Sequence, residues 1–329
     1  METVPYAFCD SVAGTVCSGE VVLVSACERN NWNSALQDHE LKRCRLTLEL
    51  RCDGQRWNSF VTCAFDHETQ EEEMFAFGSA LKYLQIEDVS VTSIDAVRED
   101  DRFLCSFEKV KDKAKAVIPF VKCARFNFSK EVDNMEDSAL SELLSCWNDT
   151  RFSYINIFSY QKPLEDFLMR QLQLGHVTCL YLKDTGWSSE LMDRIEEYAL
   201  TTNLRYLGIA DPEPQKVFDF GFFANIYERL YSCKQFYFKA HFVVDYDELD
   251  NFRKDEFHDC DYYHSHFEWK RKDGALVQFQ RNGDEPFENE PPVKWVINLG
   301  DNSLTYCRGL RSKPNKDSYG SDDRTMCRH

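Results

Sequence analysis

The densest group of metal-binding residue types in the sequence is His258-Asp-Cys260 followed by His264-Ser-His266. On an extended strand His264 and His266 would point to the same face, as neighbouring zinc ligands often do. The spacing H-x-C-x3-H-x-H matches no recognised zinc finger, and polar loops before hairpins often collect histidine and aspartate. The segment is either a zinc site or, as we expect, a surface loop, so we assign no metal or cofactor.

Sequence patterns of the common enzyme classes are missing. The chain contains no Gly-x-Ser-x-Gly nucleophile elbow, no Gly-x-Gly-x-x-Gly turn and no phosphate-binding Gly-x4-Gly-Lys-Ser/Thr loop. The pair His176 and Cys179 falls on a predicted buried strand, where a cysteine is more often an inert core residue than a nucleophile. We therefore expect a protein that is not an enzyme.

The net charge limits the classes of partner that the chain can bind, and the composition indicates the size of its core. The 329 residues include 39 Lys plus Arg against 56 Asp plus Glu, a formal net charge of −17, which argues against nucleic-acid and anionic-membrane binding. With 43% hydrophobic residues the chain can bury a large core, as roughly two domains or one elongated repeat array.

The cysteines and the N-terminal residues indicate a cellular location. The start of the sequence lacks the basic residues and apolar run of a signal peptide, and no stretch is apolar enough for a membrane helix. The 14 cysteines include no CxxC pair. We expect a cytoplasmic or nuclear protein that is not secreted, with mostly reduced cysteines in its core.

Short apolar, aromatic-rich runs alternate with amphipathic stretches from about residue 81 to about residue 244. The runs are residues 81–86, 124–128, 154–158, 178–182, 204–209 and 235–238. From residue 124 onward their starts are 30, 24, 26 and 31 residues apart, close to the period of leucine-rich repeats. This spacing predicts an α/β fold: an irregular leucine-rich-repeat-like ladder with a mainly parallel sheet and right-handed crossovers.

The stretches between these runs have helical periodicity. In residues 188–200 the apolar residues Leu191, Ile195 and Tyr198 fall on one face. Pro163 suits the first turn of a second helix and Gly175 its end. The predicted helices are residues 138–147, 163–174, 188–200 and 222–230.

Antiparallel elements are predicted at both ends of the repeat region. Residues 45–50 and 60–65 flank Asp53-Gly54 as one hairpin, and residues 266–270 and 276–280 flank a second Asp-Gly turn, with a third strand at 294–299. The expected divisions are a helical segment (1–45), a hairpin and acidic loop (46–80), the repeat region (81–245), an antiparallel module (246–309) and a disordered tail (310–329).

The N-terminal segment contains two predicted apolar helices. Phe8, Val12 and Val16 fall at helical spacing, and the run 21–27 begins a second helix before Trp32. With Val4-Pro5, these features resemble a degenerate F-box over residues 4–40. The opening Val-Pro-x-x-Phe-Cys-Asp, the aromatic-rich β/α repeats and the closing Trp-Lys-Arg-Lys-Asp-Gly hairpin are similar to the nematode expansions of F-box and F-box-associated proteins.

This resemblance implies a substrate receptor in a cullin-type ubiquitin ligase, in which the N-terminal helices bind the adaptor subunit and the repeat region binds the target. The residues that would then contact the adaptor are Val4, Pro5, Phe8, Val12, Leu23, Cys27 and Trp32. The alternative is that these side chains simply pack onto the hairpin at 45–65.

Aromatic residues on or just after the repeat strands form the second predicted contact surface. They are Tyr154, Phe158, Tyr181, Trp187, Tyr206 and Tyr237. Tyrosine and tryptophan suit protein interfaces, although such residues could also pack under the helices. We therefore expect a non-enzymatic protein-interaction module, with neither nucleic acid nor membrane as partner. The alternative is a zinc- or small-ligand-binding protein or enzyme that uses residues 258–266.

Overall fold

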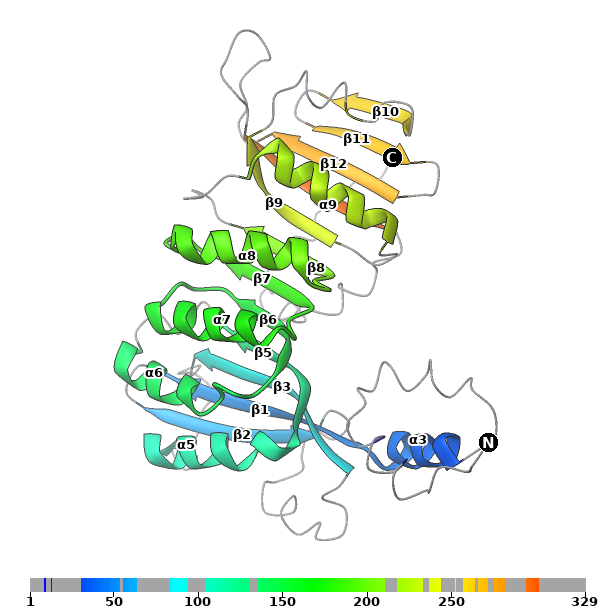
Figure 1. Ribbon diagram of the computed structural model, residues 1–329. Coiled ribbons are helices and arrows are strands. Elements are labelled where there is room, and N and C mark those ends of the chain that lie inside the picture. The colour runs from blue at the N-terminus through cyan, green and yellow to red at the C-terminus, as the bar shows by residue number, and fades with distance from the viewer. Residues whose placement is uncertain are drawn as a thin grey trace, which may run out of the picture.

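The computed structural model describes residues 31–53, 56–63, 83–93, 104–129, 135–210, 218–232, 237–243, 257–263, 266–271, 275–281 and 294–301, together with Cys9, Ala13 and Phe252. They form an α/β fold in which a long, mixed sheet carries a layer of helices (Figure 1).

The centre of the fold is a mostly parallel stretch of eight strands in the order β2-β1-β3-β5-β6-β7-β8-β9. Neighbours are parallel from β1 to β9, and only β2 pairs antiparallel, with β1. Their bounds are β1 Cys44–Cys52, β2 Trp57–Cys63, β3 Leu84–Ser93, β5 Val121–Phe128, β6 Phe152–Ile157, β7 Cys179–Lys183, β8 Tyr206–Ala210 and β9 Tyr237–Val243.

Antiparallel strands extend this sheet at both ends. The short strand β4 (Leu104–Cys105) pairs with β2, and four further strands follow β9 in the order β13-β12-β11-β10. Their bounds are β13 Lys294–Asp301, β12 Ala275–Arg281, β11 His266–Arg271 and β10 Phe257–Tyr263. The described strands therefore belong to one 13-stranded sheet.

Helices α5 to α9 cover one face of the sheet, and α3 lies beyond its end (Figure 1). The bounds are α3 Asn31–Lys42, α5 Phe107–Ala116, α6 Asp137–Ser145, α7 Lys162–Leu174, α8 Ser189–Thr201 and α9 Phe220–Ser232, with a 3-10 turn, η3, at Ile118–Phe120. None of the described helices is both long and apolar enough to cross a bilayer.

Local sequence signals set the helix ends. Pro163 lies in the first turn of α7, and Gly175 ends that helix in the left-handed region with φ 75°. The Ser188 hydroxyl caps α8 by accepting a 3.2 Å hydrogen bond from the Leu191 N–H. The side chain of Asp219 accepts from the Phe222 N–H at 2.8 Å in the same way at α9.

The core lies between the sheet and the helix layer. Its centre is an aromatic cluster of Phe126, Trp147, Phe152 and Phe167, with ring centroids 4.8 to 6.4 Å apart. All four rings are at most 3% exposed. Phe126 lies on β5 and Trp147 follows α6, whereas Phe152 lies on β6 and Phe167 on α7. The cluster therefore joins two consecutive pairs of strand and helix.

The predicted alternation of strand and helix from residue 124 onward is confirmed, and so are both hairpins and the third C-terminal strand. The leucine-rich-repeat-like ladder stays a prediction. In the hairpin predicted at 45–65, β1 pairs in parallel with β3 as well as antiparallel with β2. The helix at 21–27 and the tail from 310 lie outside the described residues.

Helix α3 and strand β4 were not predicted, and three further segments differ from the sequence expectation. A strand was predicted at 81–86, but β3 covers Leu84–Ser93. Val89 and Val91 continue its alternating pattern and are fully buried. Helix α5 was missed because its charged residues outnumber its buried apolar ones, Val110 and Ala114. The segment 258–266 was expected to be a loop, but residues 257–263 form β10.

Candidate functional site

One face of the sheet carries no helix among the described residues (Figure 1). Alternation along each strand sends every second side chain to this face. Tyr154, Tyr181 and Tyr206 lie on it, on the adjacent strands β6, β7 and β8, and all three are partly exposed. Leu180 and Leu207, which point the other way, are fully buried in the core. The sheet therefore brings three of the predicted contact residues together, and we call this surface the helix-free face.

The aromatic side chains on the helix-free face contact one another and the backbone. The rings of Phe158 and Tyr181 are 5.7 Å apart. A Cβ atom at Gly208 would lie 2.6 Å from Cδ2 of Tyr181, so the tyrosine ring packs directly over the backbone of β8. A residue without a side chain at position 208 is what allows this close approach.

One of the other predicted contact residues lies in the core, and the side chain of another is not described. Trp187 is 1% exposed and packs edge-on against Tyr160, at a centroid distance of 5.2 Å, so it belongs to the core. Tyr237 pairs with Tyr206 in the register of β8 and β9, and its side chain lies outside the described part of the chain.

The helix-free face becomes polar toward β3. Asp88 lies opposite Arg125 in the strand register and accepts a 2.7 Å hydrogen bond from Nδ2 of Asn127. Burial raises the pKa of Asp88 to about 6, although Asn127 and Arg125 oppose the shift. The carboxylates of Glu49 and Glu87 raise it further.

Replacing Asp88 with asparagine should stabilise the protein at neutral and alkaline pH. The folded state binds the Asp88 proton more tightly than the unfolded chain, whose aspartate pKa is 3.8, so stability from this group falls as pH rises from about 4 to about 6. Urea unfolding should show Asp88→Asn more stable than the wild type by up to about 3 kcal/mol at pH 8.

That gain should become small near pH 4 and vanish below it, because the folded carboxyl is already protonated there and the unfolded one becomes protonated as the pH falls below 3.8. Asp112→Asn, at an exposed position on α5, is the matched control for the substitution and should change stability by less than about 0.5 kcal/mol. A stability difference for Asp88→Asn that is the same at pH 4 and pH 8 would contradict the assignment.

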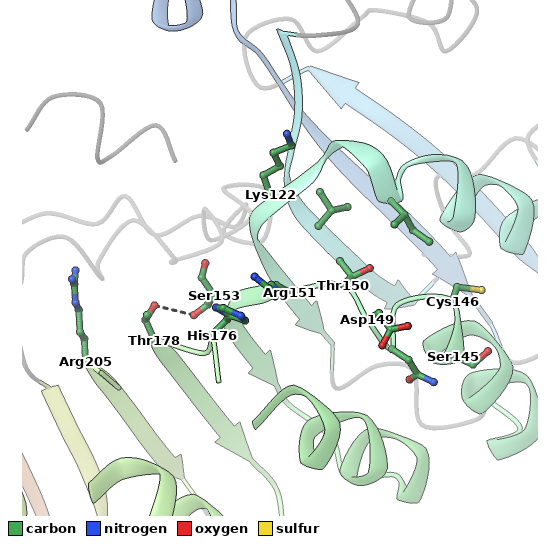
Figure 2. Close-up of a pocket in the computed structure, with 13 residues that line it drawn as sticks. Lys122, Ser145, Cys146, Asp149, Thr150, Arg151, Ser153, His176, Thr178 and Arg205 are labelled. Atoms are coloured by element: carbon green, nitrogen blue, oxygen red, sulfur yellow. Dashed lines mark hydrogen bonds between the residues drawn. The ribbon is translucent and has the colours of Figure 1, made fainter. Parts of the chain in front are cut away.

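A hollow of about 830 Å³ lies at the amino-terminal edge of β5, β6, β7 and β8 (Figure 2). The hollow is lined by four basic side chains, Lys122, Arg151, His176 and Arg205. We call these four residues the basic row. Lys122 is the second residue of β5, Arg151 and Arg205 directly precede β6 and β8, and His176 lies three residues before β7. Each of four adjacent strands therefore begins with a basic side chain at the hollow.

The basic row is exposed and carries few compensating charges. Arg151, His176 and Arg205 are exposed and Lys122 is partly buried. Within the described part of the chain none of the four forms a salt bridge. Partial burial lowers the pKa of His176, and the neighbouring positive charge of Arg151 lowers it further.

Backbone hydrogen bonds hold the edge that carries these residues. The Thr178 N–H and hydroxyl both donate to the carbonyl oxygen of Ser153, at 2.8 and 3.0 Å, and the Arg205 N–H donates to the carbonyl of Thr178 at 2.7 Å (Figure 2). The side chain of Gln171 binds the turn before β6, including the carbonyl of Thr150 at 2.9 Å. These hydrogen bonds fix the main chain at and beside Arg151 and Arg205.

The sequence analysis missed the basic row, although a signal for it exists. Its members are 29, 25 and 29 residues apart, close to the spacing of 30, 24 and 26 residues between the starts of the strand runs. A basic residue shortly before each of the first three of these runs, and at the second position of the run 204–209, therefore predicts four cations at one sheet edge, because parallel strands begin at the same edge.

The remaining predicted sites are placed only in part. Cys179 is partly exposed on the helix-free face rather than buried, and no hydrogen bond joins it to His176 among the described residues. His258 and Cys260 lie on β10 and His266 begins β11, whereas His264 is outside the described residues. Among the described residues no group of three or more potential metal ligands is found.

Of the residues predicted to contact an adaptor, only Trp32 is described. It lies on α3 and packs against a small core of Cys9, Ala13, Ala35 and Leu36, which is separate from the main core. Val4, Pro5, Phe8, Val12, Leu23 and Cys27 are outside the described residues.

Comparison with known proteins gives no family. No protein-family model matches the sequence, and no curated protein and no solved structure matches it significantly. The function must therefore be argued from the geometry of the chain.

Proposed function

We propose that this chain is a non-enzymatic protein-interaction module that binds its partner on the helix-free face. The observation that carries this proposal is the set of partly exposed aromatic side chains that Tyr154, Tyr181 and Tyr206 present on adjacent strands. Tyrosine supplies a large contact area and a hydrogen-bonding hydroxyl while losing little conformational entropy.

The specific role that we propose is the substrate-receptor arm of a cullin-type ubiquitin ligase. The separate packing of Trp32 with Cys9 and Ala13 supports an N-terminal helical unit that is distinct from the sheet. On the same helix Leu41 is 85% exposed, so its apolar side chain is available to an adaptor. No observation among the described residues favours the alternative of a zinc-dependent protein.

Photo-crosslinking of the full chain in cell lysate tests the contact face. Benzoylphenylalanine in place of Tyr206 should give a defined crosslinked product, because the side chain would lie inside the interface. The matched control replaces Leu200, which is 37% exposed on α8 on the opposite side of the sheet. Crosslinked products that are the same from both positions, or absent from both, would refute the helix-free face as the binding surface.

The receptor role is tested in the same lysate by affinity purification. Mass spectrometry should detect adaptor and cullin subunits with the wild-type chain and with Leu200→Ala. The double variant Pro5→Ala, Trp32→Ala should lose both while circular dichroism shows an intact fold. If the wild-type chain recovers no adaptor, the receptor role fails and the interaction module remains.

A further inference from the structure

The basic row is the strongest feature of the structure that the helix-free face does not explain. Lys122, Arg151, His176 and Arg205 come from separate units of the chain, yet all line one hollow (Figure 2). The chain as a whole carries a net charge of −17, so a local concentration of cations contrasts with its average surface. At the carboxyl-terminal edge, among the described ends of β5 to β8, only β7 ends at a basic residue, Lys183, and Asp184 follows it.

The length of the basic row limits what it can bind. Adjacent strands are about 4.8 Å apart, so the three steps from β5 to β8 span about 14 Å. A single phosphate group is too small to contact both ends of such a row. An extended peptide rises about 3.3 Å per residue, so about four residues match its length. The hollow, at about 830 Å³, is also within the usual size range of ligand sites.

The charges of the hollow favour an anion. Partial burial lowers the pKa of His176, and the positive charge of Arg151 lowers it further. A bound anion would offset the repulsion between these neighbouring cations. One carboxylate, that of Asp149, also lines the hollow, but it is paired with Nη2 of Arg170 at 3.0 Å. The hollow therefore presents the four basic side chains against a single carboxylate, which has an ion-pair partner of its own.

We propose that the basic row binds an extended acidic peptide segment of the protein partner. This inference rests on the proposed function, because it takes the ligand to be part of a protein. A short acidic segment fits within the hollow, whereas a nucleic acid would extend beyond it onto a strongly acidic chain. At physiological salt, charges farther away than about 8 Å are largely screened, so the local cations dominate the binding of a short segment.

The test is fluorescence anisotropy with a fluorescein-labelled hexaglutamate peptide and the full chain at physiological ionic strength. The wild type should bind hexaglutamate and should not bind the neutral hexaglutamine peptide. The double variant Arg151→Ala, Arg205→Ala should bind hexaglutamate at least tenfold more weakly. Both arginines are exposed, so these changes should leave the thermal unfolding temperature nearly unchanged.

Lys183→Ala is the matched control, since it removes an exposed positive charge from the opposite end of β7. It should change hexaglutamate affinity by less than twofold. Absence of hexaglutamate binding, or an equal loss in the control, would overturn the inference. Binding of inorganic tripolyphosphate without binding of hexaglutamate would overturn it too, in favour of a polyphosphate site.

The result of the hexaglutamate test can be distinguished from the result of the crosslinking test of the proposed function. If hexaglutamate fails to bind while the crosslink from position 206 persists, only the acidic-peptide inference is lost. If hexaglutamate binds but position 206 gives no specific crosslink, the helix-free face is refuted and the basic row remains a binding site.

Discussion

Replacing Phe126 with alanine should lower the free energy of unfolding by about 3–5 kcal/mol. Phe126 is fully buried, and its ring lies 4.8 Å from that of Phe167, 5.5 Å from Phe152 and 6.0 Å from Trp147. Truncation removes the ring from this cluster and leaves a cavity that the neighbouring rigid rings cannot fill. Urea denaturation followed by tryptophan fluorescence measures the loss.

Phe158→Ala provides the comparison. The Phe158 ring is partly exposed on the helix-free face, so its removal should lower the free energy of unfolding by distinctly less than Phe126→Ala does. Typical domains are stable by only about 5–15 kcal/mol, so Phe126→Ala could fail to fold altogether. Phe126→Leu then serves instead, and it should be destabilised by a smaller amount because it retains most of the apolar volume. Equal losses at positions 126 and 158 would mean that the aromatic cluster is not the centre of the core.

Replacing Gln171 with alanine should destabilise the protein by about 2–4 kcal/mol. Gln171 is 1% exposed on α7, and its Nε2 donates to the carbonyls of Trp147 and Thr150 at 3.4 and 2.9 Å. Its Oε1 accepts from the Phe152 N–H at 3.3 Å. The substitution would remove this partner from the buried Thr150 carbonyl and Phe152 N–H, whereas the Trp147 carbonyl still accepts from the Thr150 N–H at 3.0 Å. A buried group that loses its partner costs more than the loss of a solvent-exposed hydrogen bond.

Gln173→Ala, an exposed position on the same helix, changes helix propensity in the same direction and should alter stability by less than about 0.5 kcal/mol. Thermal unfolding of both variants by circular dichroism measures the difference. Since Gln171 holds the turn that carries Arg151, its loss should also weaken hexaglutamate binding. A Gln171 variant as stable as the Gln173 variant would show that this side chain does not hold the turn.

The hollow lies at the amino-terminal edge of the parallel strands. In open parallel sheets, ligand sites usually lie beyond the carboxyl-terminal ends of the strands. Here the hollow lies at the opposite edge, where α6 to α8 lead back into the sheet. The helix-to-strand turns at this edge are held by buried side chains such as Gln171 and Tyr198, whose hydroxyl donates to the carbonyl of Val177 at 3.0 Å. A rigid edge of this kind suits binding of a partner segment.

The sequence by itself determined the local elements of the central region. The period of the apolar residues, together with Pro163 and Gly175 for α7, predicted α7 and α8 to within one residue at each end. The hairpin turns followed from Asp-Gly pairs between alternating strands. These signals act over a few residues, so they can be read along the chain without knowing the fold.

Only the tertiary structure decided which of these elements meet. Nothing local requires β1 to pair in parallel with β3, and no local pattern separates Trp187, which is buried, from Tyr181, which is partly exposed. The basic row shows the same limit, because Arg151 and Arg205 are brought to one hollow by pairing through β7. Side-chain burial and long-range strand pairing depend on packing among segments far apart in the chain, and this packing determines which surfaces are left for binding.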